Sequence, residues 1–193
     1  MFAARVAAGL AIAIAPQIAQ PASVSFGQDV VTAAVARRIF VDDGRKMLAG
    51  TVGSCTYAYA EQPAVTFRGG RVYLRMHFSG RAGLNVNGAC MGPAESFHAT
   101  LSGQPHAEGE TIGLRDVRMD EGKKEYRNLL EPLLRRQIPA LLGSNLRSEL
   151  SRYLDSNIAD FRMLVKDFQL QDVTANDGVL QVRFDFSLQA ARR

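Results

Sequence analysis

Arginine and tyrosine side chains recur on one short stretch with the spacing of a β-strand. Arg71, Tyr73 and Arg75 alternate with apolar residues, and Arg68 lies just before the Gly-Gly pair that precedes them. A guanidinium group donates paired hydrogen bonds in a geometry that fits phosphate oxygens. These four residues are therefore candidate headgroup contacts for a phosphate-bearing ligand. The simpler alternative is a solvated strand face, because arginine and lysine are mostly exposed in folded proteins.

Three acidic residues, Asp116, Asp120 and Glu121, are close enough in sequence to suggest acid–base catalysis or a cation site. They lie at a predicted strand-to-helix turn, where acidic side chains favour a helix N-terminus for structural reasons. The three histidines show no metal-ligand spacing. The chain also lacks the G-x-S-x-G, H-E-x-x-H, phosphate-loop and dinucleotide-binding patterns. We therefore expect a non-enzymatic protein without catalytic residue, metal or cofactor, and keep a hydrolase built from scattered residues as the weakest alternative.

Cys55 and Cys90 are the two cysteines of the chain. In an exported protein such a pair predicts a disulfide, which would close a loop of about 35 residues and contribute roughly 3–4 kcal/mol in the chain-entropy treatment. In a cytosolic protein the same residues would be buried thiols. The absence of a C-x-x-C pair argues against a metal or redox site.

Composition fits one domain and argues against nucleic-acid binding. The chain has 193 residues, of which 47% are hydrophobic, and this is enough for a sizeable core. Its net charge is +4, but basic residues are interspersed with acidic ones and form no long basic block.

The N-terminus has the three-part pattern of an export signal. Arg5 supplies positive charge, residues 6–15 are apolar, and residues 16–23 are small and polar. The apolar run of about ten residues is too short to span a bilayer, which needs about 20. An ordinary apolar N-terminal helix is the alternative.

This pattern predicts a signal peptide over residues 1–22, with Ala19 or Ala22 at the cleavage site, and one domain over 23–193. No cysteine precedes Cys55, so no lipoprotein lipidation site is present. We therefore expect a periplasmic or secreted protein that is not a lipoprotein. A retained N-terminal anchor is the alternative.

A long helix is the strongest pattern in the sequence. Apolar residues recur at every fourth position over 126–158, which predicts one apolar ridge along a helix. The ridge consists of Tyr126, Leu130, Leu134, Ile138, Leu142, Leu146, Leu150, Leu154 and Ile158. A step of four residues turns roughly 400°, so the ridge moves about 40° around the axis each time. The helix must therefore be covered on several sides, or bend and reset its phase.

Two prolines and a Gly-Ser pair offer places for such a bend. Pro132 and Pro139 lie inside the helical pattern, and each would cost about 3 kcal/mol in a straight helix. Gly143-Ser144 is a further candidate break, because Ser144 can cap a second helical segment.

Alternation with a period of two predicts an antiparallel meander before the helix. Apolar residues alternate on both sides of Gly69-Gly70, which is a strong hairpin signal. Further strands are expected over 97–101 and 112–119, the second with a bulge near 115–116, where the alternation changes phase.

Two more elements flank this arrangement. The spacing of valines and isoleucine predicts a short helix over 29–40. After the long helix, alternating residues on both sides of a turn at 176–178 predict a hairpin over 161–188.

The order of these elements resembles one half of the tubular lipid-binding (TULIP) fold, and in particular the YceB-like periplasmic proteins. The resemblance covers about residues 28–188 and includes Leu101-Ser-Gly-Gln-Pro105 and Gly178-x-Leu180-x-Val182. It implies an α+β fold, in which a strongly curved antiparallel sheet wraps around the long helix and a short N-terminal helix is added. It also implies an apolar groove that accepts acyl chains. The missing lipidation site departs from the lipoprotein members.

In this interpretation apolar side chains of the helix and of the strands line the groove. They are Leu130, Leu134, Ile138 and Leu142 on the helix, with Leu74, Met76, Phe78, Phe97, Leu101, Phe184 and Phe186 on strands. Burial of each CH₂ contributes about 0.8 kcal/mol, so an acyl chain would gain free energy in such a groove. The alternative for each residue is a filled core, because protein interiors are normally close-packed.

The sequence therefore predicts an envelope protein that binds a lipid or another apolar ligand, and that carries it between membranes in the fuller version of the hypothesis. Contact with a membrane surface is expected, nucleic-acid binding is not, and no protein partner can be identified. The alternative function is a structural or assembly module of the envelope with a filled core.

Overall fold

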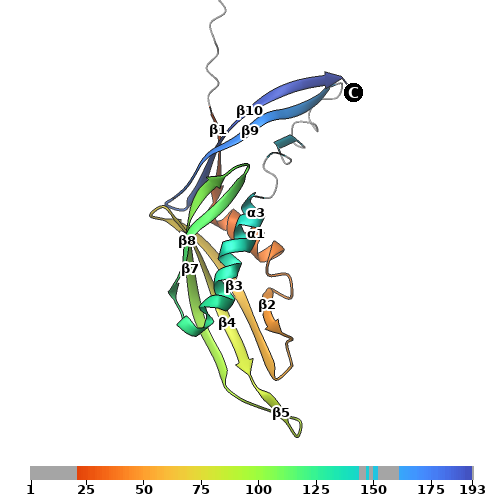
Figure 1. Cartoon of the computed structure of the whole chain (residues 1–193), viewed down its shortest axis with the longest axis vertical. Helices are drawn as coiled ribbons and strands as arrows, with labels where there is room; N and C mark the ends of the chain where they lie inside the picture. Colours follow the sequence, from red (N-terminus) through yellow and green to blue (C-terminus); the bar gives the residue numbers. More distant parts are fainter. Residues whose placement is uncertain (1–20, 144–146, 148–149, 152–160, 193) are drawn as a thin grey trace, which may run out of the picture.

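The structure, a computed structural model, describes residues 21–143, 147, 150–151 and 161–192, which form an α+β fold. All strand pairings are antiparallel. Figure 1 shows an elongated arrangement with a three-stranded sheet towards one end, a five-stranded sheet along the body and a two-stranded ribbon near the other end. The predicted signal peptide lies almost wholly outside the described residues, so it stays a prediction.

The five-stranded sheet has the order β2-β3-β4-β7-β8. Its strands are β2 (Arg45–Gly50), β3 (Thr56–Arg68), β4 (Arg71–Ala82), β7 (Ala94–Glu108) and β8 (Thr111–Glu121). Arg68 pairs with Arg71, so Gly69-Gly70 forms a two-residue loop. Both glycines have positive φ, 54° and 73°, which a side chain would disfavour. The predicted hairpin is thereby confirmed.

A bulge interrupts the pairing of β7 with β8. Two steps along β7 match three steps along β8 between the pairs Ser102–Arg118 and Gln104–Arg115. Asp116 lies in this interval with a positive φ of 50°. Because of the extra residue, Val117 and Met119 after the bulge lie on the same face of the sheet as Ile112 and Leu114 before it. This confirms the bulge that the phase change predicted.

The three-stranded sheet has the order β1-β10-β9. Its strands are β1 (Ala22–Gly27), β9 (Phe161–Asn176) and β10 (Val179–Arg192). The β9–β10 pair confirms the predicted C-terminal hairpin, whereas β1 was not expected. Turns join the two sheets: Gly70 N–H donates to the Ala175 carbonyl at 3.0 Å, and Gly178 N–H donates to the Phe67 carbonyl at 2.9 Å.

A short ribbon of β5 (Leu84–Val86) and β6 (Ala89–Met91) extends beyond the end of β4. The disulfide between Cys55 and Cys90 fastens this ribbon to the start of β3, as the sequence predicted. No pattern in these residues predicted the ribbon itself.

The first helix, α1 (Gln28–Arg38), agrees with the expected segment. The long helix is continuous as far as it is described and changes its winding on the way. It consists of a 3-10 turn η1 (Lys124–Tyr126), α2 (Arg127–Pro132), a π-helical segment η2 (Leu133–Gln137) and α3 (Ile138–Gly143). Beyond Gly143, Arg147, Leu150 and Ser151 are helical, and the remainder of the predicted helix lies outside the described residues.

The π-helical segment lies between the two prolines and explains how the chain accommodates them. Ile138 N–H donates to the carbonyl of Leu133, five residues back. Proline has no N–H to donate and its ring crowds the preceding turn, so a wider turn relieves the conflict. A wider turn also holds more residues, so a step of four residues rotates less around the helix axis than in an α-helix. The π-helical turn therefore offsets the rotation of the apolar ridge around the axis. Leu130 and Leu134 consequently stay on the buried side together with Ile138.

The helical region packs against β7 and β8, and α3 contacts α1 (Figure 1). It is therefore covered by the sheet on one side and by α1 on another. One continuous apolar core joins the helices to both larger sheets.

Candidate apolar ligand site

The candidate site is the contact zone between the helical region 127–143 and the five-stranded sheet, here called the seam. Seven predicted lining residues on this sheet and on the helical region belong to one continuous core, each at most 1% exposed. They are Leu74, Met76 and Phe78 of β4, Leu101 of β7, and Leu130, Leu134 and Ile138 of the helical region. The structure thus buries these seven side chains in one core, and that they line a ligand groove stays a prediction.

The other predicted lining residues lie at its margins or in the second sheet. Phe97 is partly buried against the core. Phe184 is 8% exposed on β10 and belongs to the same core, and the partly buried Phe186 packs against it. The side chain of Leu142 lies outside what the structure describes. That these residues line a ligand groove stays a prediction.

An aromatic cluster lies at the N-terminal end of the helical region. The ring centroids of Phe78 and Phe97 are 4.8 Å apart, and Tyr126 lies 4.7 Å and 5.4 Å from them. Lys123 lies 5.9 Å from the Phe97 ring centroid and forms an ion pair with Glu95. The hydrogen bond to Glu95 raises the pKa of Lys123 above its ordinary value of 10.5. This end of the seam is therefore capped by rings and one ion pair.

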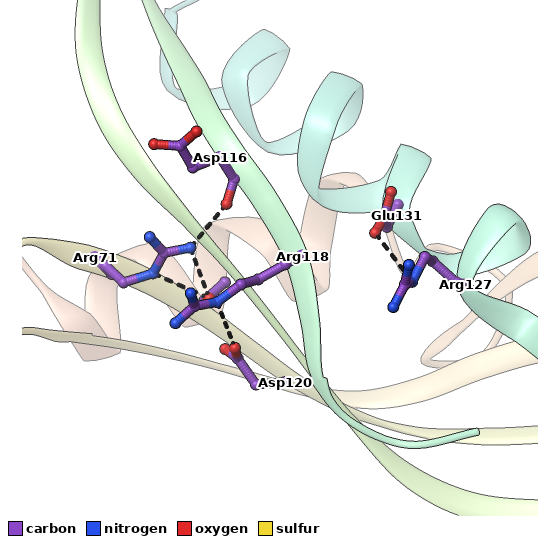
Figure 2. A network of polar contacts seen from close by, with 7 residues as sticks. Arg71, Asp116, Arg118, Asp120, Arg127 and Glu131 are labelled. Atoms are coloured by element: carbon purple, nitrogen blue, oxygen red, sulfur yellow. Dashed lines mark hydrogen bonds and ion pairs between the residues drawn. The ribbon is translucent and has the colours of Figure 1, made fainter. Parts of the chain in front are cut away.

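The outward side of the helical region is polar and paired with itself. Glu131 lies 3.7 Å from Arg127 and 3.8 Å from Arg135, each one helical turn away, and Figure 2 shows the first pair. Among the described residues, these ion pairs stay on the helix. Apolar contact is therefore what holds this part of the helix to the sheet.

Arg71, a predicted headgroup contact, is buried and bound to protein groups. Its Nε and Nη2 donate to Ser102 Oγ at 3.1 Å and 3.0 Å, and Nη2 donates to the Asp116 carbonyl at 2.8 Å (Figure 2). The bulge on β8 turns this carbonyl towards the guanidinium group. Arg71 thus ties three strands together at the bulge, a role that the sequence did not indicate.

The other three predicted headgroup contacts lie nearer to solvent. The Arg68 guanidinium lies 4.4 Å from the centroid of the Tyr73 ring, a cation–π arrangement. Arg68 and Arg75 are exposed, and Tyr73 is half-buried. These three side chains are less buried than Arg71. Their contact with a headgroup stays a prediction.

On the face of the five-stranded sheet opposite the seam, an acid, an imidazole and a hydroxyl group form a chain of polar contacts. His77 Nδ1 lies 3.2 Å from Glu61 Oε1, and His77 Nε2 lies 2.9 Å from Ser96 Oγ. Arg45 donates to Glu61 at 3.1 Å, and this hydrogen bond raises the pKa of Arg45. Such a chain can activate a hydroxyl only beside a pocket that holds a substrate. These contacts join β2, β3, β4 and β7 through side chains, in addition to their backbone pairing.

Among the residues that the structure describes, pockets lie away from the predicted groove residues at two places. One of about 330 Å³ lies where the two larger sheets meet and is lined mainly by β7 residues 104–107 and β9 residues 172–176. The other, of about 440 Å³, lies at the base of the β5–β6 ribbon and is lined by Thr56, Ala82, Gly83, Leu84, Met91 and Gly92.

In the part of the chain that the structure describes, no group of three or more histidine, cysteine, aspartate or glutamate side chains is placed to hold a metal ion. None of the described helices has both the length and the hydropathy needed to cross a bilayer.

Comparison with known proteins gives little beyond this geometry. No protein-family model matches the sequence, and no curated protein matches it. A solved structure described as a crystal structure of lipopolysaccharide binding protein is similar over 91% of this chain, with 12% sequence identity and a TM-score of 0.29. The similarity covers 52% of that protein, so this chain spans about half its length.

Proposed function

We propose that this protein binds a lipid or another apolar ligand in the seam, as a non-catalytic protein of an envelope compartment. One observation carries the proposal: residues 127–143 of the helical region meet the sheet through apolar side chains, and the ion pairs of Glu131 with Arg127 and Arg135 stay within these residues. An alkyl chain can therefore replace side-chain contacts across the seam without leaving a polar group unpaired.

Separation of the helix from the sheet is the step that such binding requires. Exposing the seam would cost the hydrophobic free energy of its side chains, and each CH₂ of an inserted chain would offset about 0.8 kcal/mol of it. The π-helical segment between two prolines is a natural joint, because breaks of this kind are where helices bend. In this proposal α2 moves relative to α3 to admit the ligand.

The cysteine chemistry supports the proposed compartment. The Cys55–Cys90 disulfide favours an oxidising environment, which agrees with the predicted export signal. A relationship to the YceB-like proteins and a carrier role between membranes are parts of the proposal that rest on the order of elements alone.

A second function is favoured by a specific observation. Exposure of at most 1% at seven seam residues is what a filled core gives. Such a core would make the protein a structural or assembly module, which functions through contacts of its surface and not through a ligand in its interior.

A photoactivatable fatty acid distinguishes the two functions. The delipidated protein is incubated with the probe, irradiated and digested, and labelled peptides are identified by mass spectrometry. We expect saturable labelling at Met76, Leu130 and Leu134 that excess unlabelled fatty acid prevents. The exposed Val30 and Leu188 serve as controls for adsorption, because they are 63% and 45% exposed outside the seam. Labelling confined to such surface positions, with no lipid in native mass spectra of the purified protein, would support the filled module instead.

A further inference from the structure

The strongest unexplained feature is an uncovered apolar surface at the end of the molecule opposite the three-stranded sheet. We call this end the tip, consisting of β5, β6, the loop between them and the neighbouring loop 51–55 (Figure 1). Its large apolar side chains are mostly in solvent: Leu84 is 76% exposed, Met91 63%, Val52 56% and Val86 49%. Isolated exposed apolar residues are ordinary, but a cluster at one end marks a contact surface.

The pairing of the ribbon gathers these side chains on one face. Leu84 pairs with Met91 and Val86 pairs with Ala89, so these four share a face. Cys90 lies on the other face, where the disulfide attaches it to Cys55. The cross-link therefore attaches the ribbon through its other face and leaves the large side chains of the apolar face, Leu84, Val86 and Met91, exposed.

The tip is also free of charge. No aspartate, glutamate, lysine, arginine or histidine occurs in residues 47–60 or 82–94, the two stretches that build the tip and its base. Across a chain in which 22% of residues are charged, an exposed end without any charge is unusual for a surface that stays in water. It is the composition that entry into a bilayer requires, because a charged group is costly there.

Behind the tip lies a rim suited to the lipid headgroup layer. The rings of Tyr57 and Tyr59 stack with centroids 5.8 Å apart, and both are half-buried on β3. Arg81 lies opposite Tyr57 in the pairing of β3 with β4. Among the described residues, Arg81 has no hydrogen-bond or ion-pair partner, and its buried Nε is unsatisfied. Tyrosine rings favour the membrane–water interface, and arginine is attracted to anionic headgroups.

We propose that the tip inserts into the surface of a lipid bilayer, with Leu84, Val86 and Met91 among the acyl chains and the tyrosine–arginine rim at the headgroups. A bilayer fits better than a protein partner, because strands of three residues each offer far less than the roughly 800 Å² per partner of a standard protein interface. The inference does not depend on a ligand in the seam.

The chain contains no tryptophan, so a single introduced tryptophan reports on its own surroundings. Val86→Trp and the control Val30→Trp are each mixed with vesicles of phosphatidylcholine and phosphatidylglycerol, using delipidated protein. Val30 is a matched control because it is 63% exposed on α1, away from the tip. We expect a blue shift of the emission for Val86→Trp and none for Val30→Trp. Equal shifts, or no shift for Val86→Trp, would overturn the proposal.

Flotation with the same vesicles gives the energetic test. Leu84→Glu should lower the bound fraction by about tenfold or more, because it removes one buried leucine and adds a charge at the apolar face. Val30→Glu should bind like the wild type. Unaltered binding by Leu84→Glu, or no binding by the wild type, contradicts the proposal. Since both experiments use protein without ligand, failure of the seam to bind lipid would leave their outcome unchanged.

Discussion

The seam and the tip are two apolar surfaces of one chain that differ in what covers them. Leu74 in the seam is 1% exposed, whereas Leu84, ten residues later and just beyond the end of the same strand, is 76% exposed. The difference lies outside the strand. The helical region begins at Lys124 and runs along the body of the sheet, leaving the ribbon without a helix above it. Hydropathy along a strand therefore shows which side chains are apolar. Which of these side chains are buried depends on the placement of the other elements.

The same comparison separates two uses of charge. The helix over the seam carries paired charges on its outward side, as expected for a cover that stays in water. The tip has none in the stretches 47–60 and 82–94. An apolar surface covered by a helix with charged outer residues suits a core or an internal ligand. An exposed apolar surface without charge suits contact with the apolar part of a lipid bilayer.

The largest expected effect separates the two surfaces by stability. Leu134→Ala should lower the free energy of unfolding by about 2–5 kcal/mol, because it opens a cavity in the seam. Leu84→Ala should change it by less than about 0.5 kcal/mol, since the side chain is already in solvent. Urea unfolding followed by circular dichroism measures both values. Similar losses for the two variants would contradict the contrast between a covered and an uncovered surface.

Removal of the disulfide should affect the tip more than the seam. The double variant Cys55→Ser/Cys90→Ser should lose roughly 2–4 kcal/mol of stability, because the unfolded chain is no longer constrained. It should also raise hydrogen exchange in β5 and β6 ahead of the seam strands, since the ribbon loses its attachment. Exchange measured by mass spectrometry checks this. Uniform acceleration in all strands would show that the cross-link supports the whole fold equally.

A smaller effect is expected at the bulge behind the seam. Arg71→Met removes donors to Ser102 and Asp116 while keeping a side chain of comparable length, and should destabilise by about 1–3 kcal/mol. Arg75→Met is the matched control on the same strand, because Arg75 is exposed, and should stay within about 0.5 kcal/mol. If both variants behave alike, the buried hydrogen bonds of Arg71 are not what stabilises the bulge.

The smallest effect concerns alkaline pH at the capped end of the seam. The pKa of Lys123 is raised above 10.5 by its hydrogen bond to Glu95. A raised pKa means that the contribution is fully present below pH 10.5 and is lost as the pH rises through the pKa of the folded state. Wild type should therefore lose slightly more stability above pH 10.5 than Lys123→Gln, with Lys124→Gln behaving like wild type. Thermal unfolding across this pH range measures the difference, and parallel curves for all three proteins would contradict it.

Much of the fold could be predicted because local residue types determine it. Gly69-Gly70 requires a turn, the change of phase near Arg115 requires an extra residue, and the alternation after Gly178 requires a strand. The apolar ridge predicted which helix residues face the sheet. The prolines predicted a disturbance in the helix, although not that it would be a π-helical turn.

What could not be predicted depends on distant parts of the chain. Residues 22–27 form β1 only because β10 offers them an edge, and nothing in these six residues indicates that partner. The buried state of Arg71 depends on the carbonyl that the bulge presents. The absence of charge over 82–94 was visible in the sequence, but its meaning required knowing that this stretch lies at an uncovered end.

The pairing of β1 with β10 sets the order in which this chain can fold. The first described strand finds its partner only after residues 179–184 have emerged from the ribosome. Contacts so far apart in sequence form slowly, because closing the intervening chain loses entropy before any pairing compensates for it. The three-stranded sheet must therefore be among the last parts to assemble, whereas the five-stranded sheet pairs only strands between Arg45 and Glu121 and can form before β9 and β10 are made.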